Sequence, residues 1–137
     1  MNAIHGYAVI FIGAGIGGCL RHGVNRLFGA SGSFFPWATL MVNCTGSLIM
    51  GLLAGWFAFR AGEAQSLHLP VTGTSGQHFK LFLTTGLLGG YTTFSAFSLD
   101  AALLWERGRM WSVVFYVGSS VLLSIAALFA GLAIMRP

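Results

Sequence analysis

The sequence predicts an all-α membrane protein with four transmembrane helices per subunit, the third of them broken mid-membrane. The first observation is composition: 55% of the 137 residues are hydrophobic and only 7% are charged, whereas soluble domains carry about 25% charged residues. The second is that residues 1–20, 27–59, 81–99 and 110–135 contain no Asp, Glu, Lys or Arg. The third is a run rich in glycine and threonine inside the third of these stretches.

The lengths of the uncharged stretches set the positions of the spans, because a helix needs about 20 apolar residues to cross a bilayer. We expect a single integral membrane domain over 1–137, with spans at about 4–25, 37–59, 80–104 and 112–135 and a polar loop over 60–78. The lipid bilayer is therefore a partner. Positive residues are scattered, so nucleic acid is not expected as a partner.

The first two spans each carry a glycine pair at four-residue spacing, and each has a polar residue of possible functional importance. Gly13 with Gly17, and Gly51 with Gly55, favour close helix packing. Arg21, near the end of the first span, either snorkels to the headgroups or gives a fixed charge that attracts anions to a vestibule or pins the fold. Lipid cannot satisfy a polar amide. The amide in the second span belongs to Asn43 and either bonds to a neighbouring helix or contacts a ligand.

The third span contains paired glycines followed by the pair Thr92-Thr93. Paired glycines and paired β-branched residues weaken a helix. A break here would free backbone carbonyls, which can coordinate a cation in a protein cavity. The alternative is an unbroken helix in which Gly86 and Gly90 form a packing face.

Aromatic and hydroxyl side chains follow this run. Phe94 and Phe97 are three residues apart and would share a helix face. Thr92, Ser95 and Ser98 would form a neighbouring hydroxyl stripe at the same spacing. Plain packing explains most aromatic pairs, but the electropositive edge of a phenyl ring can also face an anion. With hydroxyl donors beside it, such an edge would replace part of an anion's hydration shell.

The fourth span carries Tyr116, Ser120 and Ser124 at positions i, i+4 and i+8, which form one line on one helix face. Serines in membrane helices often bond only to the preceding turn. Three polar residues at one spacing favour a hydrated track.

The distribution of positively charged residues barely favours one orientation of the spans in the membrane. One side carries Arg21, Arg26, Arg107 and Arg109, and the other carries Arg60, Lys80 and Arg136. Either a single charge decides the orientation, or copies insert both ways and pair head to tail, as a two-chain version of an inverted repeat.

Taken together, these motifs resemble the Fluc-type (CrcB) bacterial fluoride ion channel family, in the same order and with one motif in each span. The stretches are Gly17-Gly18-Cys19-Leu20-Arg21, Pro36-Trp37-Ala38-Thr39-Leu40-Met41-Val42-Asn43, the run from Gly86 to Ser98, and Tyr116 with Ser120 and Ser124. The likeness covers nearly the whole chain apart from loop 60–78.

The resemblance implies an antiparallel dual-topology homodimer in the bacterial inner (cytoplasmic) membrane, with two fluoride pores that passively export fluoride and give fluoride resistance. It implies a structural sodium ion at the dimer centre, on the backbone carbonyls of Gly89 and Thr92. It gives Arg21 a vestibule or structural role. The implied pore residues are Asn43, Thr93, Phe94, Ser95, Phe97, Ser98, Tyr116, Ser120 and Ser124.

Two residues depart from the family pattern: Ala38 stands where glycine is usual and His22 where an aromatic residue is usual. The rival function is a small dual-topology proton-coupled multidrug transporter, which needs a membrane-embedded acidic residue that the first span lacks. An enzyme is not expected, because Glu63, Asp100 and Glu106 form no catalytic set.

Overall fold

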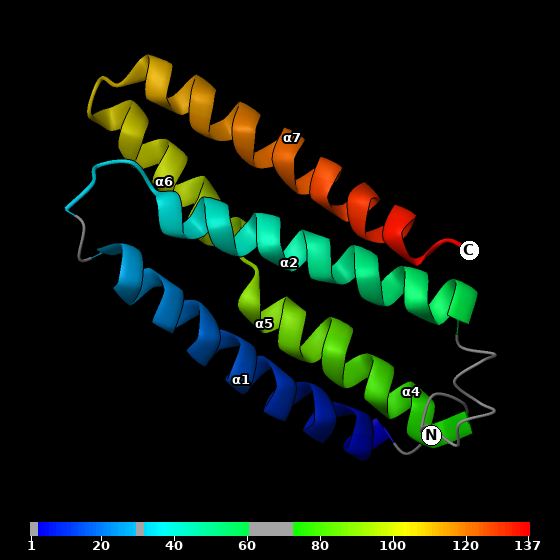
Figure 1. Cartoon of the computed structure of the whole chain (residues 1–137). Helices are drawn as coiled ribbons and strands as arrows, with labels where there is room; N and C mark the ends of the chain where they lie inside the picture. Colours follow the sequence, from blue (N-terminus) through cyan, green and yellow to red (C-terminus); the bar gives the residue numbers. More distant parts are fainter. Residues whose placement is uncertain (1–2, 30–31, 61–72) are drawn as a thin grey trace.

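The computed structural model describes residues 3–29, 32–60 and 73–137, and within these ranges it contains helices and short turns but no strand (Figure 1). The predicted all-α class is therefore confirmed. In chain order the elements are α1 (Ala3–Gly29), α2 (Trp37–Gly55), the π-helical turn η1 (Trp56–Arg60), α4 (Gly73–Leu81), the π-helical segment η2 (Phe82–Leu88), α5 (Gly89–Tyr91), α6 (Phe94–Glu106) and α7 (Met110–Met135).

Three continuous helices are long and apolar enough to cross a membrane, and they correspond to the first, second and fourth predicted spans. They cover Ile4–Gly29, Trp37–Phe59 and Met110–Met135. The predicted third span is divided between two rods, α4 with η2 and α5 on one side and α6 on the other. The protein is therefore a multi-pass membrane protein whose third pass is discontinuous.

The predicted polar loop was too long at both ends. Helix α4 begins at Gly73, and η1 continues the second span through Arg60, so residues 60 and 73–78 are helical. Extending an existing helix by one residue is much easier than nucleating a new one, which explains why polar residues continue an apolar helix at each end. The remaining loop residues, 61–72, lie outside the described part of the chain.

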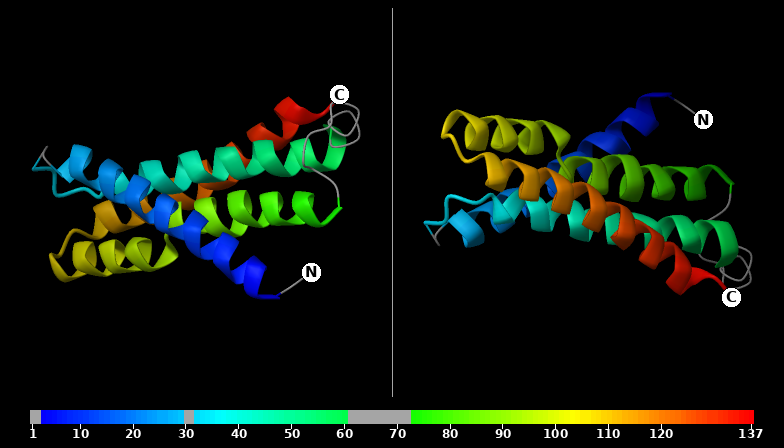
Figure 2. Two further views of the ribbon diagram at one scale, coloured as in Figure 1. Left: turned by 90° about the horizontal axis from the view of Figure 1, so that it is seen from below. Right: turned by 90° about the horizontal axis from the view of Figure 1, so that it is seen from above.

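The helices form two pairs that lie against each other (Figures 1 and 2). Helix α1 packs along α4, η2 and α5, while α2 packs along α7. Helix α6 continues beyond α5 and packs on α7. Helices α2 and α7 run in the same direction, opposite to α1 and the third pass. Equivalent turns of α2 and α7 therefore face each other, which positions the site described below.

Glycines let the first and third passes approach at backbone distance. A Cβ on Gly13 would lie 2.9 Å from Gly86 Cα, and one on Gly90 would lie 2.8 Å from Ala14 Cα. A Cβ on Gly17 would overlap the third-pass backbone as well. The predicted small-residue packing of the first span is confirmed, and its partner is the glycine face of the third pass.

Glycines also allow close backbone packing between α2 and α7. A Cβ on Gly51 would collide with the carbonyl of Leu128, and one on Gly55 would lie 2.6 Å from Met135 Cβ. Gly131 faces the backbone of α2 in the same way. These contacts confirm the second predicted glycine pair as a packing face and fix the distance between α2 and α7.

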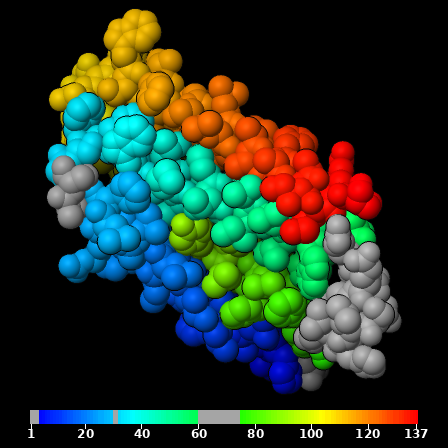
Figure 3. Space-filling view, viewed as in Figure 1, coloured from blue at the N-terminus to red at the C-terminus, as the bar shows by residue number. Residues whose placement is uncertain are grey.

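Large apolar side chains cover much of the outer surface, part of which is visible in Figure 3. Phe11 on α1 is 80% exposed and Phe129 on α7 is 63% exposed. Soluble monomers rarely expose wide apolar faces of this kind. The outer faces of α1 and α7 therefore suit acyl chains or another protein surface.

Candidate functional site: a polar groove beside the helix break

The third pass breaks at the two threonines. Thr92 and Thr93 have extended backbones, with ψ angles of 158° and 116°, as β-branched residues favour. Gly89 remains helical, with φ −64° and ψ −37°. The predicted break is confirmed, but it follows the glycines instead of including them. Gly86 and Gly90 form the packing face that was the alternative interpretation, so both features occur in one pass.

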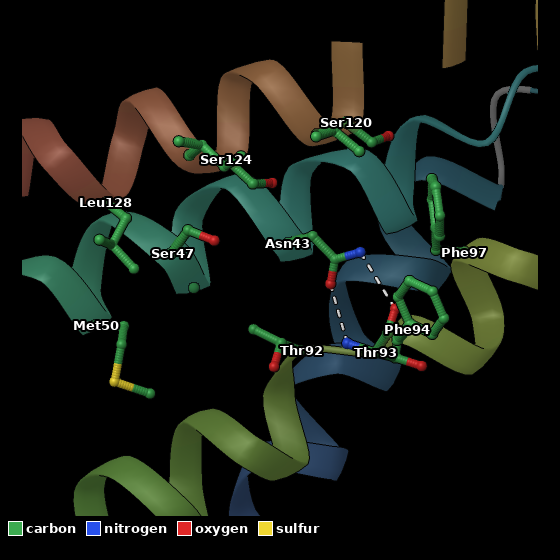
Figure 4. Close-up of a pocket in the computed structure, with 13 residues that line it drawn as sticks. Asn43, Ser47, Met50, Thr92, Thr93, Phe94, Phe97, Ser120, Ser124 and Leu128 are labelled. Atoms are coloured by element: carbon green, nitrogen blue, oxygen red, sulfur yellow. Dashed lines mark hydrogen bonds between the residues drawn. The ribbon is translucent and has the colours of Figure 1, made fainter. Parts of the chain in front are cut away.

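Asn43 of α2 holds the break open through a pair of hydrogen bonds to the backbone of one residue, Thr93 (Figure 4). The backbone N–H of Thr93 donates to Asn43 Oδ1 at 2.9 Å, and Asn43 Nδ2 donates to the Thr93 carbonyl at 3.2 Å. Thr93 is only 8% exposed, so both backbone groups need these partners. The amide therefore makes the interhelical contact that the sequence allowed, and one Nδ2 hydrogen is left over.

The side chain of Thr93 then starts α6. Its Oγ1 accepts a hydrogen bond of 3.1 Å from the backbone N–H of Ala96, which is the contact of an N-cap residue. Ser95 Oγ lies 3.2 Å from the same oxygen. Thr93 thus ends one rod with its backbone and begins the next with its hydroxyl.

The break releases backbone carbonyls at its edge. In a continuous helix the N–H of Thr93 would bond to the carbonyl of Gly89, and the N–H of Ala96 to the carbonyl of Thr92. Here those donors bind Asn43 and the Thr93 hydroxyl instead. The carbonyls of Gly89 and Thr92 therefore lack the donors that a continuous helix would give them. Among the described residues no cluster of three His, Cys, Asp or Glu could hold a metal.

A groove of about 410 Å³ opens beside the break, between α2, α7 and the start of α6 (Figure 4). Its walls come from three passes, and no charged side chain is among them. The lining residues are Asn43, Gly46, Ser47, Met50, Thr92, Thr93, Phe94, Phe97, Ser120, Val121, Ser124, Ile125 and Leu128.

Two polar lines at four-residue spacing run along the facing helices. Helix α2 carries Thr39, Asn43 and Ser47, and α7 carries Tyr116, Ser120 and Ser124. Ser120 is 5% exposed and its hydroxyl has no partner within the described residues. Within the same described part of the chain, Ser124 Oγ contacts only Cys44 Sγ, at 3.7 Å. The groove is therefore lined by hydroxyls with unused hydrogen-bonding capacity.

A carboxylate joins the two lines at one end. Thr39 Oγ1 donates to Asp100 Oδ2 at 2.7 Å, and the hydroxyl of Tyr116 donates to the same oxygen at 3.2 Å. Tyr116 is fully buried and Thr39 is 8% exposed. The carboxylate thus receives two donors, which is how proteins tolerate a partly buried acidic group.

The two phenylalanines lie where the groove meets this cluster. Their ring centroids are 5.5 Å apart, and Phe97 lies 5.3 Å from Tyr116. Phe94 is 79% exposed, whereas Phe97 is half-buried. Both line the groove, as Figure 4 shows. The pair therefore shares a face of α6, as its spacing predicts.

The predicted hydroxyl stripe is wrong as a single helix face. Thr92 precedes the break, so it belongs to a different rod from Ser95 and Ser98. Its Oγ1 donates to the carbonyl of Leu88, and Ser98 Oγ donates to that of Phe94. Both serines are exposed and neither lines the groove. A break in the helix removes the periodicity on which the stripe depended.

Two further predicted residues lie away from the groove wall. Tyr116 packs against Phe97 and does not line the groove itself. Its hydroxyl donates to Asp100. Arg21 is half-buried on α1 and is not part of the lining.

Sequence reasoning missed Thr39, Ser47 and Asp100. Thr39 and Ser47 could have been identified by their spacing, because they lie four residues before and four residues after Asn43. Asp100 could have been identified as the one acidic residue within the predicted spans.

Together these features define a multi-pass helical membrane protein with an uncharged polar groove at a broken helix. The model of the family described as "CrcB-like protein, Camphor Resistance (CrcB)" matches residues 8–132. The chain belongs to this family.

Curated relatives are similar over nearly their whole length. The "Fluoride-specific ion channel FluC" of Rhodopseudomonas palustris (strain BisB5) is 52% identical over 131 residues, covering 95% of this chain and 96% of the relative. The protein of the same name from Methylobacterium sp. (strain 4-46) is 52% identical over 128 residues, covering 93% and 94%. That of Paracoccus denitrificans (strain Pd 1222) is 45% identical over 132 residues, covering 96% and 95%.

Proposed function

We propose that this protein is a fluoride-selective channel that passively exports fluoride from the cytoplasm of a bacterium and so gives fluoride resistance. The names of its relatives support fluoride as the ion. The observation that carries the proposal is the groove, whose lining contains polar side chains and two phenylalanine rings but no charged side chain.

Selectivity follows from what the groove wall offers an anion. The spare N–H of Asn43 and the hydroxyls of Ser47, Ser120 and Ser124 are all hydrogen-bond donors facing one space. Fluoride is small and strongly hydrated, so it loses most when water is removed and gains most from closely spaced donors. A larger halide forms weaker bonds to the same donors. Stepwise replacement of water by protein donors is a general basis of channel selectivity.

The driving force needs no coupled proton. Hydrogen fluoride enters cells as a neutral acid and dissociates at cytoplasmic pH. A negative-inside potential then drives the anion outward with about 2.3 kcal/mol per charge per 100 mV. Asp100 accepts hydrogen bonds from Thr39 and Tyr116, and we assign it to holding those hydroxyls at the end of the path.

The functional unit is an antiparallel, dual-topology homodimer in the bacterial inner membrane. Phe94 lines the groove yet is 79% exposed in one chain. A second copy would cover this ring and close the groove into a pore. The balanced distribution of positive residues over the two sides suits insertion in both directions.

A structural sodium ion fits the carbonyls at the break. Gly89 and Thr92 both lose the donors that a continuous helix would supply, and Gly89 is exposed where a second chain would approach. Carbonyl oxygens are suitable ligands for a hard cation. When bound, the ion would supply fixed positive charge near the anion path, while the residues named above hold the break open.

The test is ion efflux from liposomes containing the purified protein, loaded with fluoride or with chloride. We expect rapid electrogenic efflux of fluoride and efflux of chloride near that of protein-free liposomes. Ser120→Ala should slow fluoride efflux, because Ser120 lines the groove. Ser119→Ala is the matched control, since Ser119 Oγ bonds to the Tyr116 carbonyl and does not line the groove. Equal efflux of both anions, or of neither, would contradict the proposal.

A further inference from the structure

A second pocket lies at the end of the bundle where α2 and α7 begin. Its volume is about 410 Å³, within the range of small-ligand sites. It is lined by aromatic rings and two serine side chains, from the segment before α2 and from the first two turns of α7. The lining residues are Ser33, Phe34, Phe35, Trp37, Trp111, Ser112 and Phe115.

An oriented arginine stands at the rim of this pocket. The guanidinium carbon of Arg109 lies 3.8 Å from the centroid of the Phe34 ring. At this distance the cation lies over the ring face, and an arginine carries several N–H donors in a fork that matches phosphate oxygens. Arg109 makes no ion pair within the described residues, although Glu106 is only three positions away. Its charge is held in place but not neutralised.

The depth of the pocket indicates which ligand would reach it. Trp37 and Met110 are the first residues of two stretches that are long and apolar enough to span the membrane. The pocket between them therefore lies at the level of the lipid headgroups, where tryptophan concentrates. Trp111 is 85% exposed and Phe115 is 59% exposed, so an apolar path continues from the pocket along α7 towards the acyl region.

The pocket also supplies neutral donors beside the charge. Ser33 Oγ accepts a hydrogen bond of 3.2 Å from the backbone N–H of Phe35, which leaves its hydroxyl hydrogen free. The hydroxyl of Ser112 has no partner within the described residues. A ligand with ester and phosphate oxygens at one end and hydrocarbon at the other would satisfy both the donors and the rings.

We propose that this pocket binds one anionic glycerophospholipid, with its phosphodiester on Arg109, its glycerol esters near Ser33 and Ser112, and its acyl chains along Phe115. Charge complementarity supports an anionic lipid, because the segment from Glu106 to Arg109 carries two arginines against one glutamate and is net positive. The site lies on a different face from the groove and does not depend on the proposed ion conduction.

Native mass spectrometry of the delipidated full-length protein tests the proposal by titration with phosphatidylglycerol or with phosphatidylcholine of the same acyl chains. We expect a saturable adduct of one phosphatidylglycerol per chain and weaker binding of phosphatidylcholine. Arg109→Gln should weaken phosphatidylglycerol binding about tenfold, in line with loss of a charge-assisted hydrogen bond. Arg109→Lys should weaken it less. Arg136→Gln removes one exposed charge at the other end of α7 and should have no effect.

Phe34→Leu provides a second variant that keeps every charge and removes only the ring beneath the guanidinium, so it should also weaken binding. Unchanged circular dichroism verifies the fold of each variant. Equal affinity in Arg109→Gln and Arg136→Gln, or equal affinity for the two lipids, would overturn the proposal. So would displacement of the lipid by excess inorganic phosphate, which would indicate a free-anion site.

Discussion

Asn43 and Thr93 exchange two hydrogen bonds across the gap between α2 and the broken third pass. A side-chain amide is a planar donor–acceptor pair, as a peptide group is, so it can replace the two neighbours that the Thr93 backbone loses when the helix ends. The one side-chain amide that the sequence places in the second span thus stabilises the break of the third pass at Thr93. It also places a spare N–H in the groove.

Replacing Asn43 with leucine should destabilise the protein strongly. The substitution leaves the buried N–H and carbonyl of Thr93 without partners, and each unsatisfied group costs about 1–3 kcal/mol. We expect a loss of about 2–5 kcal/mol in unfolding free energy, measured by chemical denaturation in detergent. Ser47→Ala is the control, because Ser47 lies one turn further along the same helix and makes no hydrogen bond within the described residues. Similar stability of the two variants would contradict a stabilising role for the two Asn43–Thr93 hydrogen bonds.

The glycine contacts between α1 and the third pass predict position-specific effects of alanine. Gly17→Ala should destabilise the protein by about 1–3 kcal/mol or more, since its Cβ would overlap backbone that has no flexible side chain to move. Gly15→Ala on the same helix meets nothing within 4 Å and should preserve stability. Thermal melting of the two variants in detergent would show the difference, and a Gly17→Ala variant as stable as Gly15→Ala would argue against this packing.

The carboxylate of Asp100 should stabilise the fold by accepting hydrogen bonds from the hydroxyls of Thr39 and Tyr116. Asp100→Ala leaves the buried hydroxyls of Thr39 and Tyr116 without their acceptor, so we expect a loss of about 2–4 kcal/mol in unfolding free energy. Asp100→Asn keeps one acceptor oxygen and should lose roughly half as much. If chemical denaturation gave equal values for wild type and Asp100→Ala, the cluster would have no structural role.

The two phenylalanines test whether the groove conducts. Replacing both Phe94 and Phe97 with isoleucine keeps them apolar but removes the electropositive ring edges that we propose face the anion. We expect at least a tenfold fall in fluoride efflux from liposomes with little loss of folded protein. Leu99→Ala, at an exposed position of the same helix outside the groove, should leave efflux unchanged. Full efflux in the double variant would mean that the rings only pack.

The positions of the spans could be predicted from the sequence because the bilayer requires about 20 consecutive residues that are apolar and largely uncharged. Gly13, Gly17, Gly51 and Gly55 were identifiable as packing positions because their spacing matches the helix repeat. The break of the third pass was identifiable as well. Its register was not, because the sequence alone could not show that Gly90 is required for contact with α1, which leaves Thr92 and Thr93 to carry the extended backbone.

The Asp100 cluster shows a different limit of sequence reasoning. Thr39 and Asp100 are 61 positions apart, and no local periodicity connects them. The hydroxyl stripe of Thr92, Ser95 and Ser98 failed for the opposite reason, because its periodicity was real but crossed the break. Local spacing is informative only while the helix continues, and long-range pairs depend on the direction in which α2 and α7 pack.

The most direct test of the proposed function is the current carried by the purified protein in a planar bilayer, with opposing gradients of fluoride and protons. A passive fluoride channel should reverse at the fluoride equilibrium potential whatever the proton gradient, and replacing fluoride with chloride should abolish the current. A reversal potential that followed the proton gradient, or one that was unchanged when chloride replaced fluoride, would contradict selective conduction through the groove.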